Sequence, residues 1–221
     1  NCHVAVSAVC LLSVSPFFLS YATEVKPYMS DAFVALLLLY ISLRVTDMKF
    51  GLTILCLSGI ISIYLSNASV IILCSIGLYL LYQARVLGLN AYPLVFVIFI
   101  WIFSFGVNYH LLLSPSLGNP YFKEYWGNKF LPFSHPEFWY FGTHVLKTIG
   151  RTIFAYPLHH WAWKLFGFLY ISCFLSIIFN RAFSYAYLLV FPLLLHILLS
   201  SLELYPFVDR LLFYQIPLFV M

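Results

Sequence analysis

Two stretches decide the fold of this chain: VALLLLYISL at residues 34–43 and LLVFPLLLHILL at residues 188–199. Both are continuous apolar runs, whereas the strands of a membrane β-barrel alternate apolar and polar positions over about ten residues. Inside a lipid bilayer only helices and closed barrels satisfy all their backbone hydrogen bonds. The two runs therefore predict membrane-spanning α-helices.

The composition extends this prediction to the whole chain. Of its 221 residues, 63% are hydrophobic and only 8% are charged, and the mean hydropathy is +0.98, whereas a soluble domain has roughly 25% charged residues. The net charge of +4 is small and does not indicate nucleic-acid binding. We expect a multi-pass integral membrane protein in which residues 1–221 form a single all-α transmembrane domain.

Apolar runs long enough to cross a bilayer, at about 17 to 25 residues, recur along the chain. Because Asn1 falls within such a run and the last residues form another, we interpret the chain as the later portion of a longer protein. About eight spans are predicted, the first and last of them partial. They are 1–19, 31–46, 50–66, 69–84, 91–112, 164–180, 184–202 and 211–221.

The long connection at 113–163 is predicted to be an extracytoplasmic loop. Its segment PEFWYFGTHVLKTIGRTIFAY at 136–156 separates apolar from polar positions with helical periodicity, which favours an amphipathic helix in the membrane interface. The preceding stretch is rich in Gly, Pro, Asn and aromatic residues, so we expect it to be irregular. Cations of the short loops are more frequent on the opposite, predicted cytoplasmic side. These cations are Arg44, Lys49, Arg85 and Arg181.

Cysteine and histidine patterns do not indicate a metal centre. All five cysteines lie inside apolar runs and none forms a C-x-x-C pair, which favours buried, inert thiols over disulfides or metal ligands. The adjacent His159 and His160 would face different sides of a helix and make a poor metal site. We predict no cofactor and no metal site, although a divalent metal remains open.

The first polar cluster is SYATEVKPYMSD at residues 20–31, which lies between two apolar runs. Pro27 interrupts any continuous helix here. Charged groups that face the mouth of a membrane protein indicate a functional site by default, so the cluster is interpreted as an outward polar pocket. The alternative is that Glu24 and Lys26 are solvated loop charges and that Asp31 is the N-cap of the next helix.

The second polar cluster is ELYPFVDRLLF at residues 203–213, which the topology places on the same outward side. Arg210, with an aromatic neighbour, could hold a phosphate through paired charge-assisted hydrogen bonds. The alternative is an interfacial anchor whose charged end reaches the lipid headgroups.

In both clusters the sequence resembles GT-C membrane glycosyltransferases of the family 39, dolichyl-phosphate-mannose mannosyltransferase-like type. In that family an S-P pair is followed by a tyrosine, an E-x-[RK]-x-Y core and a long span, and a late span ends in Y-P-F-x-x-R. The matching residues of the first motif are Ser15, Pro16, Tyr21, Glu24, Lys26 and Tyr28. The matching residues of the second are Tyr205, Pro206, Phe207, Arg210 and Pro217.

The resemblance implies a helical bundle with an extracytoplasmic cavity, in the bacterial inner membrane. It would move a sugar from a polyprenyl phosphate to a glycan, lipid or protein, and its catalytic acid would lie upstream of residue 1. The substrate-binding candidates are Glu24, Lys26, Tyr28, Asp31, Tyr205 and Arg210. Additional phosphate contacts are expected from Lys123, Lys129, Lys147 and Arg151.

Two other functions fit the same sequence. A non-catalytic membrane subunit could use this fold as a scaffold within a larger complex. A transporter of lipid-linked precursors should carry charged or broken helices near the bilayer midplane. Here most charges lie at the ends of spans, and His196 is the main ionisable residue deep within one.

Overall fold

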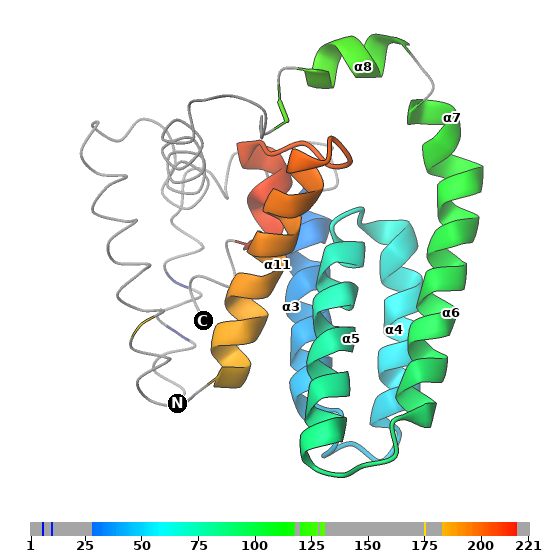
Figure 1. Cartoon of the computed structure of the whole chain (residues 1–221), viewed down its shortest axis with the longest axis vertical. Coiled ribbons are helices and arrows are strands. Elements are labelled where there is room, and N and C mark those ends of the chain that lie inside the picture. Colours follow the sequence, from blue (N-terminus) through cyan, green and yellow to red (C-terminus); the bar gives the residue numbers. More distant parts are fainter. Residues whose placement is uncertain are drawn as a thin grey trace. The chain divides into compact units, whose positions relative to one another are not determined.

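The computed structural model describes residues 28–117, 120–127, 129–130 and 183–215, with single positions at Val6, Cys10 and Leu175. Within these ranges every regular element is a helix and no strand occurs, which confirms the all-α class. The chain divides into two compact units, residues 1–32 with 129–221 and residues 33–128 (Figure 1). Apart from those single positions, the predicted spans 1–19 and 164–180 and the interfacial helix at 136–156 lie outside the described residues.

Helix α3 (Tyr28–Arg44) begins directly after Pro27 and crosses from the first unit into the second. Asp31 lies in its first turn and Arg44 in its last, and both charges are favourable to the helix dipole. Because the helix begins three residues before Asp31, the prediction that Asp31 is the N-cap is wrong. The alternative interpretation of Glu24 and Lys26 as solvated loop charges concerns residues outside the described ranges.

The second unit is built around three helices, α4 (Gly51–Leu65), α5 (Ser69–Val86) and α6 (Tyr92–Asn108). Figure 1 shows consecutive helices running in opposite directions, as their short connections predict, so that α4 and α6 run in the same direction. Helix α4 contacts both α5 and α6, and α5 contacts α6. The core residues of these helices are Leu55, Ile63, Ile72, Ile76, Val97 and Trp101. The three helices match the predicted spans 50–66, 69–84 and 91–112 to within a few residues.

Local sequence signals end α5 and begin α6. Gly88 adopts a left-handed conformation with φ of 65°. Its N–H donates to the Arg85 carbonyl, and the Leu89 N–H donates to the Ala84 carbonyl at 2.8 Å, which is the Schellman pattern of helix termination. At the start of α6 the Asn90 side chain accepts a hydrogen bond from the N–H of Tyr92 at 3.0 Å. These contacts fix the tight turn between the two helices.

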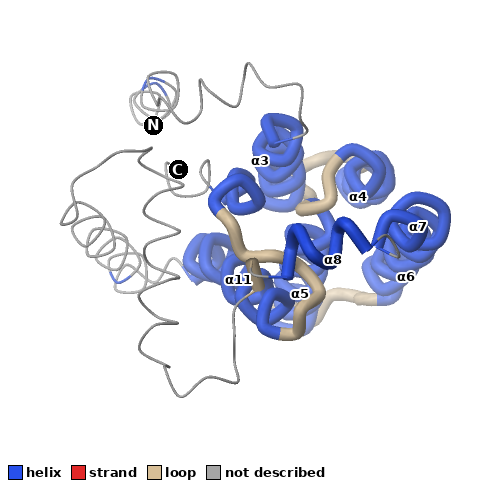
Figure 2. Tube along the Cα trace, turned by 90° about the horizontal axis from the view of Figure 1, so that it is seen from above, coloured by secondary structure: helices blue, strands red, loops and turns tan. Residues whose placement is uncertain are grey.

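Helix α6 continues through the π-helix η1 (Tyr109–Leu113) into α7 (Ser114–Leu117), so the helical rod passes the predicted start of the loop at 113. A separate helix, α8 (Pro120–Gly127), follows, and Figure 2 shows its axis lying across the bundle. The prediction that the stretch before residue 136 is irregular is wrong for Pro120–Gly127, which form α8. Proline at the first position and glycine at the last are the residues that favour the start and end of a helix.

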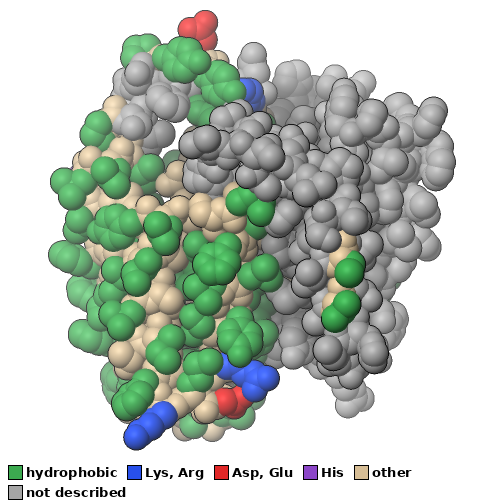
Figure 3. Space-filling view, turned by 180° about the vertical axis from the view of Figure 1, so that it is seen from behind, with side chains coloured by type: hydrophobic (Ala, Val, Ile, Leu, Met, Phe, Trp, Pro, Cys, Tyr) green, Lys and Arg blue, Asp and Glu red, His purple; other side chains and the backbone are tan. Residues whose placement is uncertain are grey.

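Two helices of the described residues are long and apolar enough to cross a membrane: α5, with 18 residues, and Tyr92–Leu113, with 22. Helix α4 and the segment Tyr187–Ser201 are apolar but shorter. Figure 3 shows hydrophobic side chains spread over the described surface, with cationic side chains at its lower end and a further one near its upper edge. Arg44, Lys49 and Arg85 are exposed, and each lies at or beside a helix terminus.

A shallow apolar groove of about 200 Å³ lies between α5 and α6. Gly77 forms part of its lining, together with Leu81, Ile98 and Trp101. Cys74 also lines the groove and is exposed, as is Cys10, whereas Cys56 is half-buried. The prediction that the cysteines are buried is therefore wrong for Cys10 and Cys74.

The described part of the first unit consists mainly of α11 (Phe183–Ser201) and the 3-10 helix η2 (Asp209–Gln215). Helix α11 agrees with the predicted span 184–202 and contains Pro192. The predicted last span, 211–221, differs in its first residues, because Leu211–Gln215 belong to the 3-10 helix. Its remaining residues lie outside the described ranges.

Candidate functional site

A polar network surrounds His196, whose side chain is fully buried within α11. The imidazole Nδ1 lies 3.0 Å from the Tyr214 hydroxyl, and Nε2 lies 2.9 Å from the backbone carbonyl oxygen of Pro206. The two ring nitrogens therefore join α11 to two separate points of the segment that follows it. We call this segment, residues 202–215, the corner segment.

The partners of His196 determine the direction of its hydrogen bonds. A carbonyl oxygen only accepts, so Nε2 must carry the proton that is donated to Pro206. In the neutral imidazole Nδ1 is then the acceptor, and the Tyr214 hydroxyl donates to it. The same hydroxyl lies 3.5 Å from the carbonyl oxygen of Pro192, one turn earlier in α11. That distance is at the limit of hydrogen bonding, so His196 is the principal partner of Tyr214.

Three aromatic rings enclose the imidazole. The ring of Tyr205 lies 4.8 Å from it and that of Phe207 5.3 Å, both edge to face, measured between ring centroids. Tyr214 stacks nearly parallel at 5.9 Å. Phe207 and Tyr214 are themselves fully buried. The hydrogen bond between His196 and Tyr214 is thus shielded from water, whereas the one to Pro206 is partly buried. A low local dielectric strengthens a shielded bond.

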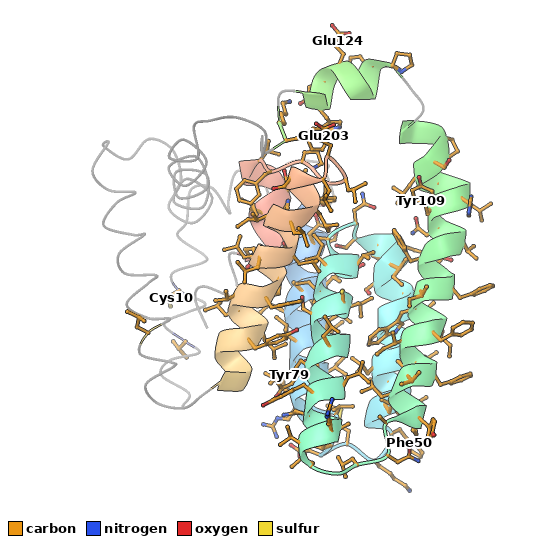
Figure 4. The ribbon with its side chains drawn as sticks, viewed as in Figure 1. Cys10, Phe50, Tyr79, Tyr109, Glu124 and Glu203 are labelled. Atoms are coloured by element: carbon orange, nitrogen blue, oxygen red, sulfur yellow. The ribbon has the colours of Figure 1, made fainter. Side chains whose placement is uncertain are left out.

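The backbone of the corner segment reverses direction at the end of α11. The N–H of Leu204 donates to the Leu199 carbonyl at 2.9 Å, and the N–H of Glu203 donates to the Ser200 carbonyl at 3.0 Å, again a Schellman pattern. Glu203 adopts φ of 57°, a conformation that glycine usually occupies at this position. Figure 4 shows Glu203 at the C-terminal end of α11. The next proline, Pro206, cannot continue a helix, and η2 begins only at Asp209.

The corner segment is also bound to the end of the long connection. The N–H of Phe207 donates to the backbone carbonyl oxygen of Lys129 at 2.9 Å. This hydrogen bond places the backbone of Lys129 directly beside the Y-P-F motif. Lys129 is one of the predicted phosphate contacts. The two segments are far apart in the sequence but adjacent in the first unit.

Asp31 belongs to the same unit and is only 5% exposed. This residue of the first turn of α3 is thus buried within the same compact unit as the corner segment. Gln215 is buried as well, and its side chain approaches the Tyr214 hydroxyl without completing a hydrogen bond. We call these four buried polar residues of the first unit, Asp31, His196, Tyr214 and Gln215, the buried polar cluster.

Of the predicted site residues, Asp31, Lys129 and Tyr205 belong to the first unit. Tyr205 contacts the His196 ring, and the Lys129 carbonyl accepts a hydrogen bond from Phe207. Three others lie in described helices, but their side chains do not belong to the described part. These are Tyr28 in α3, Lys123 in α8 and Arg210 in η2. Four further candidates lie outside the described residues. These are Glu24, Lys26, Lys147 and Arg151.

Sequence reasoning missed the role of His196 and of its partner Tyr214. The available signal was a single histidine within the apolar run 188–199. Placing an ionisable residue inside a membrane segment costs free energy, so such a residue suggests a functional site. Ser200, one turn later, is also fully buried. Polar residues four positions apart share one face of a helix, which would have indicated a polar side of α11.

Among the described residues, no group of three His, Cys, Asp or Glu side chains could hold a metal ion. No family model matches the chain, and neither a curated protein nor a solved structure is significantly similar to it.

Proposed function

We propose that the chain is the later portion of a GT-C type glycosyltransferase, a multi-pass protein of the bacterial inner membrane. It would transfer a sugar from a polyprenyl-phosphate donor to a glycan, lipid or protein acceptor on the extracytoplasmic side. The proposal requires no nucleic acid and no cofactor in this part of the chain. It is based on the two sequence motifs, and one structural observation supports it.

That observation is the meeting of three separate segments in the first unit. Asp31 follows the E-x-K-x-Y motif, Tyr205 opens the Y-P-F-x-x-R motif, and Lys129 belongs to the connection between them. The hydrogen bond from the N–H of Phe207 to the Lys129 carbonyl joins two of these segments, and Asp31 is buried in the same unit. A site that binds one substrate must gather residues of both motifs, and this arrangement is consistent with such a site.

The proposed site lies at one face of the membrane. Asp31 and Arg44 occupy opposite ends of α3, which has 17 residues and is thus about 25 Å long at 1.5 Å per residue. Exposed cations near Arg44 are typical of the cytoplasmic side. The buried polar cluster would then lie toward the extracytoplasmic headgroups, where a prenyl chain stays in the bilayer while its sugar meets a hydrated acceptor.

The reaction makes one bond and breaks another. An acceptor hydroxyl oxygen attacks the anomeric carbon, the bond between that carbon and the phosphate oxygen breaks, and polyprenyl phosphate leaves with the bonding electrons. The hydroxyl proton passes to a carboxylate that the resemblance places upstream of residue 1. Fixed cations aimed at the leaving phosphate lower the barrier. We assign this role to Lys26 and Arg210, assisted by Lys123, Lys129, Lys147 or Arg151, with Glu24, Tyr28 and Tyr205 near the sugar.

The test measures sugar transfer from a lipid-linked donor by the full-length protein. We expect Arg210→Ala and Glu24→Gln to lower kcat/KM by about 10²-fold, since removing one preorganised charge or donor costs about that much. Lys26→Arg should retain activity because arginine is the commoner residue in the motif. Lys49→Ala is the control, because Lys49 is an exposed cation that lies over the Phe50 ring beside the start of α4.

Unchanged rates in both Arg210→Ala and Glu24→Gln, at normal expression, would remove these residues from the site. Absence of transfer by the wild-type protein with every polyprenyl-phosphate sugar would instead favour a non-catalytic subunit or a transporter of lipid-linked precursors.

A further inference from the structure

We propose that His196 is the positioning residue of the corner segment: it holds the backbone from which Tyr205 and Arg210 project at a fixed place relative to α11. The inference rests on the proposed function, because it concerns residues assigned there to the donor sugar and phosphate. His196 itself has no contact with substrate in this proposal. It acts through Pro206 and Tyr214.

The geometry of the ring carries the inference. Pro206 and Tyr214 are the two residues held by His196, and Arg210 lies midway between them along the chain. A loop whose two ends are fixed to one rigid side chain has few conformations left to lose when it binds a ligand. The imidazole is suited to this task because it offers one donor and one acceptor on separate edges of a rigid ring.

Burial makes both contacts obligatory. His196 and Tyr214 are fully buried, so neither can replace a lost partner by bulk water. The surrounding rings of Tyr205 and Phe207 also restrict the rotation of the imidazole. An apolar residue in place of His196 would fill the space but leave the Pro206 carbonyl without its donor and the Tyr214 hydroxyl with only the 3.5 Å contact to the Pro192 carbonyl. We therefore expect the corner segment to shift until these two groups find other hydrogen-bond partners.

The position of the corner segment matters for transfer because charge stabilisation depends on distance. A misplacement of about 1 Å in a site can lower a rate by about 10²-fold. The donor phosphate would be met by Arg210 from η2 and by cations from other segments, so the relative position of these segments must be preserved. Lys129 is already joined to this region through the N–H of Phe207.

A series of substitutions at one position tests the inference in the full-length protein. His196→Leu removes both hydrogen bonds, His196→Gln can retain the bond of Nε2 to Pro206, and His196→Asn can retain that of Nδ1 to Tyr214. His110→Leu is the matched control, since His110 lies on η1 and is exposed. Two quantities are measured for each variant: transfer kinetics with a polyprenyl-phosphate sugar, and amide hydrogen exchange along the chain.

We expect His196→Leu to lower kcat/KM by about 10²-fold and to accelerate exchange at the amides of Phe207, Leu211 and Leu212. Exchange in α5 should stay unchanged, and the Gln and Asn variants should each recover part of the rate. Unchanged exchange in the corner segment of His196→Leu, or an equal increase in α5, would overturn the proposal. Unchanged kcat/KM would overturn it as well.

The two proposals can fail separately. If the wild-type protein transfers no sugar, the proposed function fails. The exchange measurement still decides whether His196 holds the corner segment.

Discussion

Gly59 of α4 lies directly against the indole ring of Trp101 of α6. A Cβ atom built on Gly59 would be 2.1 Å from the indole Nε1, far inside any allowed contact. The same nitrogen donates a hydrogen bond to the backbone carbonyl oxygen of Cys56 at 3.3 Å. The absence of a side chain at position 59 thus allows a large aromatic residue to pack between two helices and bind the backbone of one of them.

Gly59→Ala should therefore destabilise the second unit. The new methyl group would displace a buried ring, and overpacking of this kind costs about 1 to 3 kcal/mol. Gly106→Ala is the matched control in α6, because a Cβ there meets nothing within 4 Å. It should be neutral or slightly stabilising, since alanine is the better helix former. The midpoint of thermal unfolding in detergent measures both, and an equal midpoint for the two variants would contradict this account of Gly59.

Asn108 provides a second contact between α4 and α6. Its Nδ2 donates to the Ile63 carbonyl at 2.7 Å, and Asn108 is buried. Ile63 lies in the last turn of α4, where carbonyl groups have no partner within the helix. Asn108→Leu should cost about 1 to 3 kcal/mol, because it leaves a buried acceptor without its partner. Asn90→Leu is the exposed control, with a smaller loss, and the free energy of unfolding in denaturant is the measurement.

The helices of the second unit could be predicted from the sequence because each apolar run is bounded by turn signals. Gly88 and Asn90 separate α5 from α6, and both make the contacts that such residues usually make in turns. Helix α8 was not predicted, since its aromatic residues are equally frequent in irregular segments. The exposure of Cys74 was also missed, because an apolar run does not reveal which of its faces meets other helices.

The buried polar cluster could be predicted only in part. Asp31 and Tyr205 were candidates because they lie at the ends of apolar runs, where charged and polar groups are informative. His196 binds residues 10 and 18 positions further along the chain. Sequence spacing within a helix reports contacts three or four residues apart, but it does not report contacts across a change of direction. The contacts of His196 with Pro206 and Tyr214 could be recognised only from the path of the corner segment in the structure.

Glu203 occupies a left-handed conformation that costs a residue with a side chain about 1 kcal/mol relative to glycine. Glu203→Gly should therefore stabilise the first unit by about that amount, because the substitution removes the unfavourable conformation without loss of a buried contact. Glu203 is exposed, which makes the substitution a clean test. The reverse case, Gly88→Ala at φ of 65°, should destabilise by a similar amount. Unfolding midpoints that move in the same direction for both variants would contradict this interpretation.

Tyr214→Phe separates the hydroxyl from the ring. The substitution keeps the stacked ring beside His196 but removes the hydroxyl that donates to Nδ1. Since a buried hydrogen bond contributes about 1 kcal/mol and an unpaired buried nitrogen costs more, we expect a loss of about 1 to 2 kcal/mol. Tyr92→Phe is the control, because Tyr92 is 83% exposed.

The 15N chemical shifts of His196 provide the decisive measurement for this variant. If Nε2 carries the proton that is donated to Pro206, its shift should remain that of a protonated ring nitrogen in Tyr214→Phe, while the shift of Nδ1 should change through loss of the donor hydroxyl. A proton found on Nδ1 and not on Nε2 in the wild-type protein would reverse the hydrogen bond to the Tyr214 hydroxyl and abolish the one to the Pro206 carbonyl, which can only accept. It would also remove the reason why Pro206 and Tyr214 need a histidine between them.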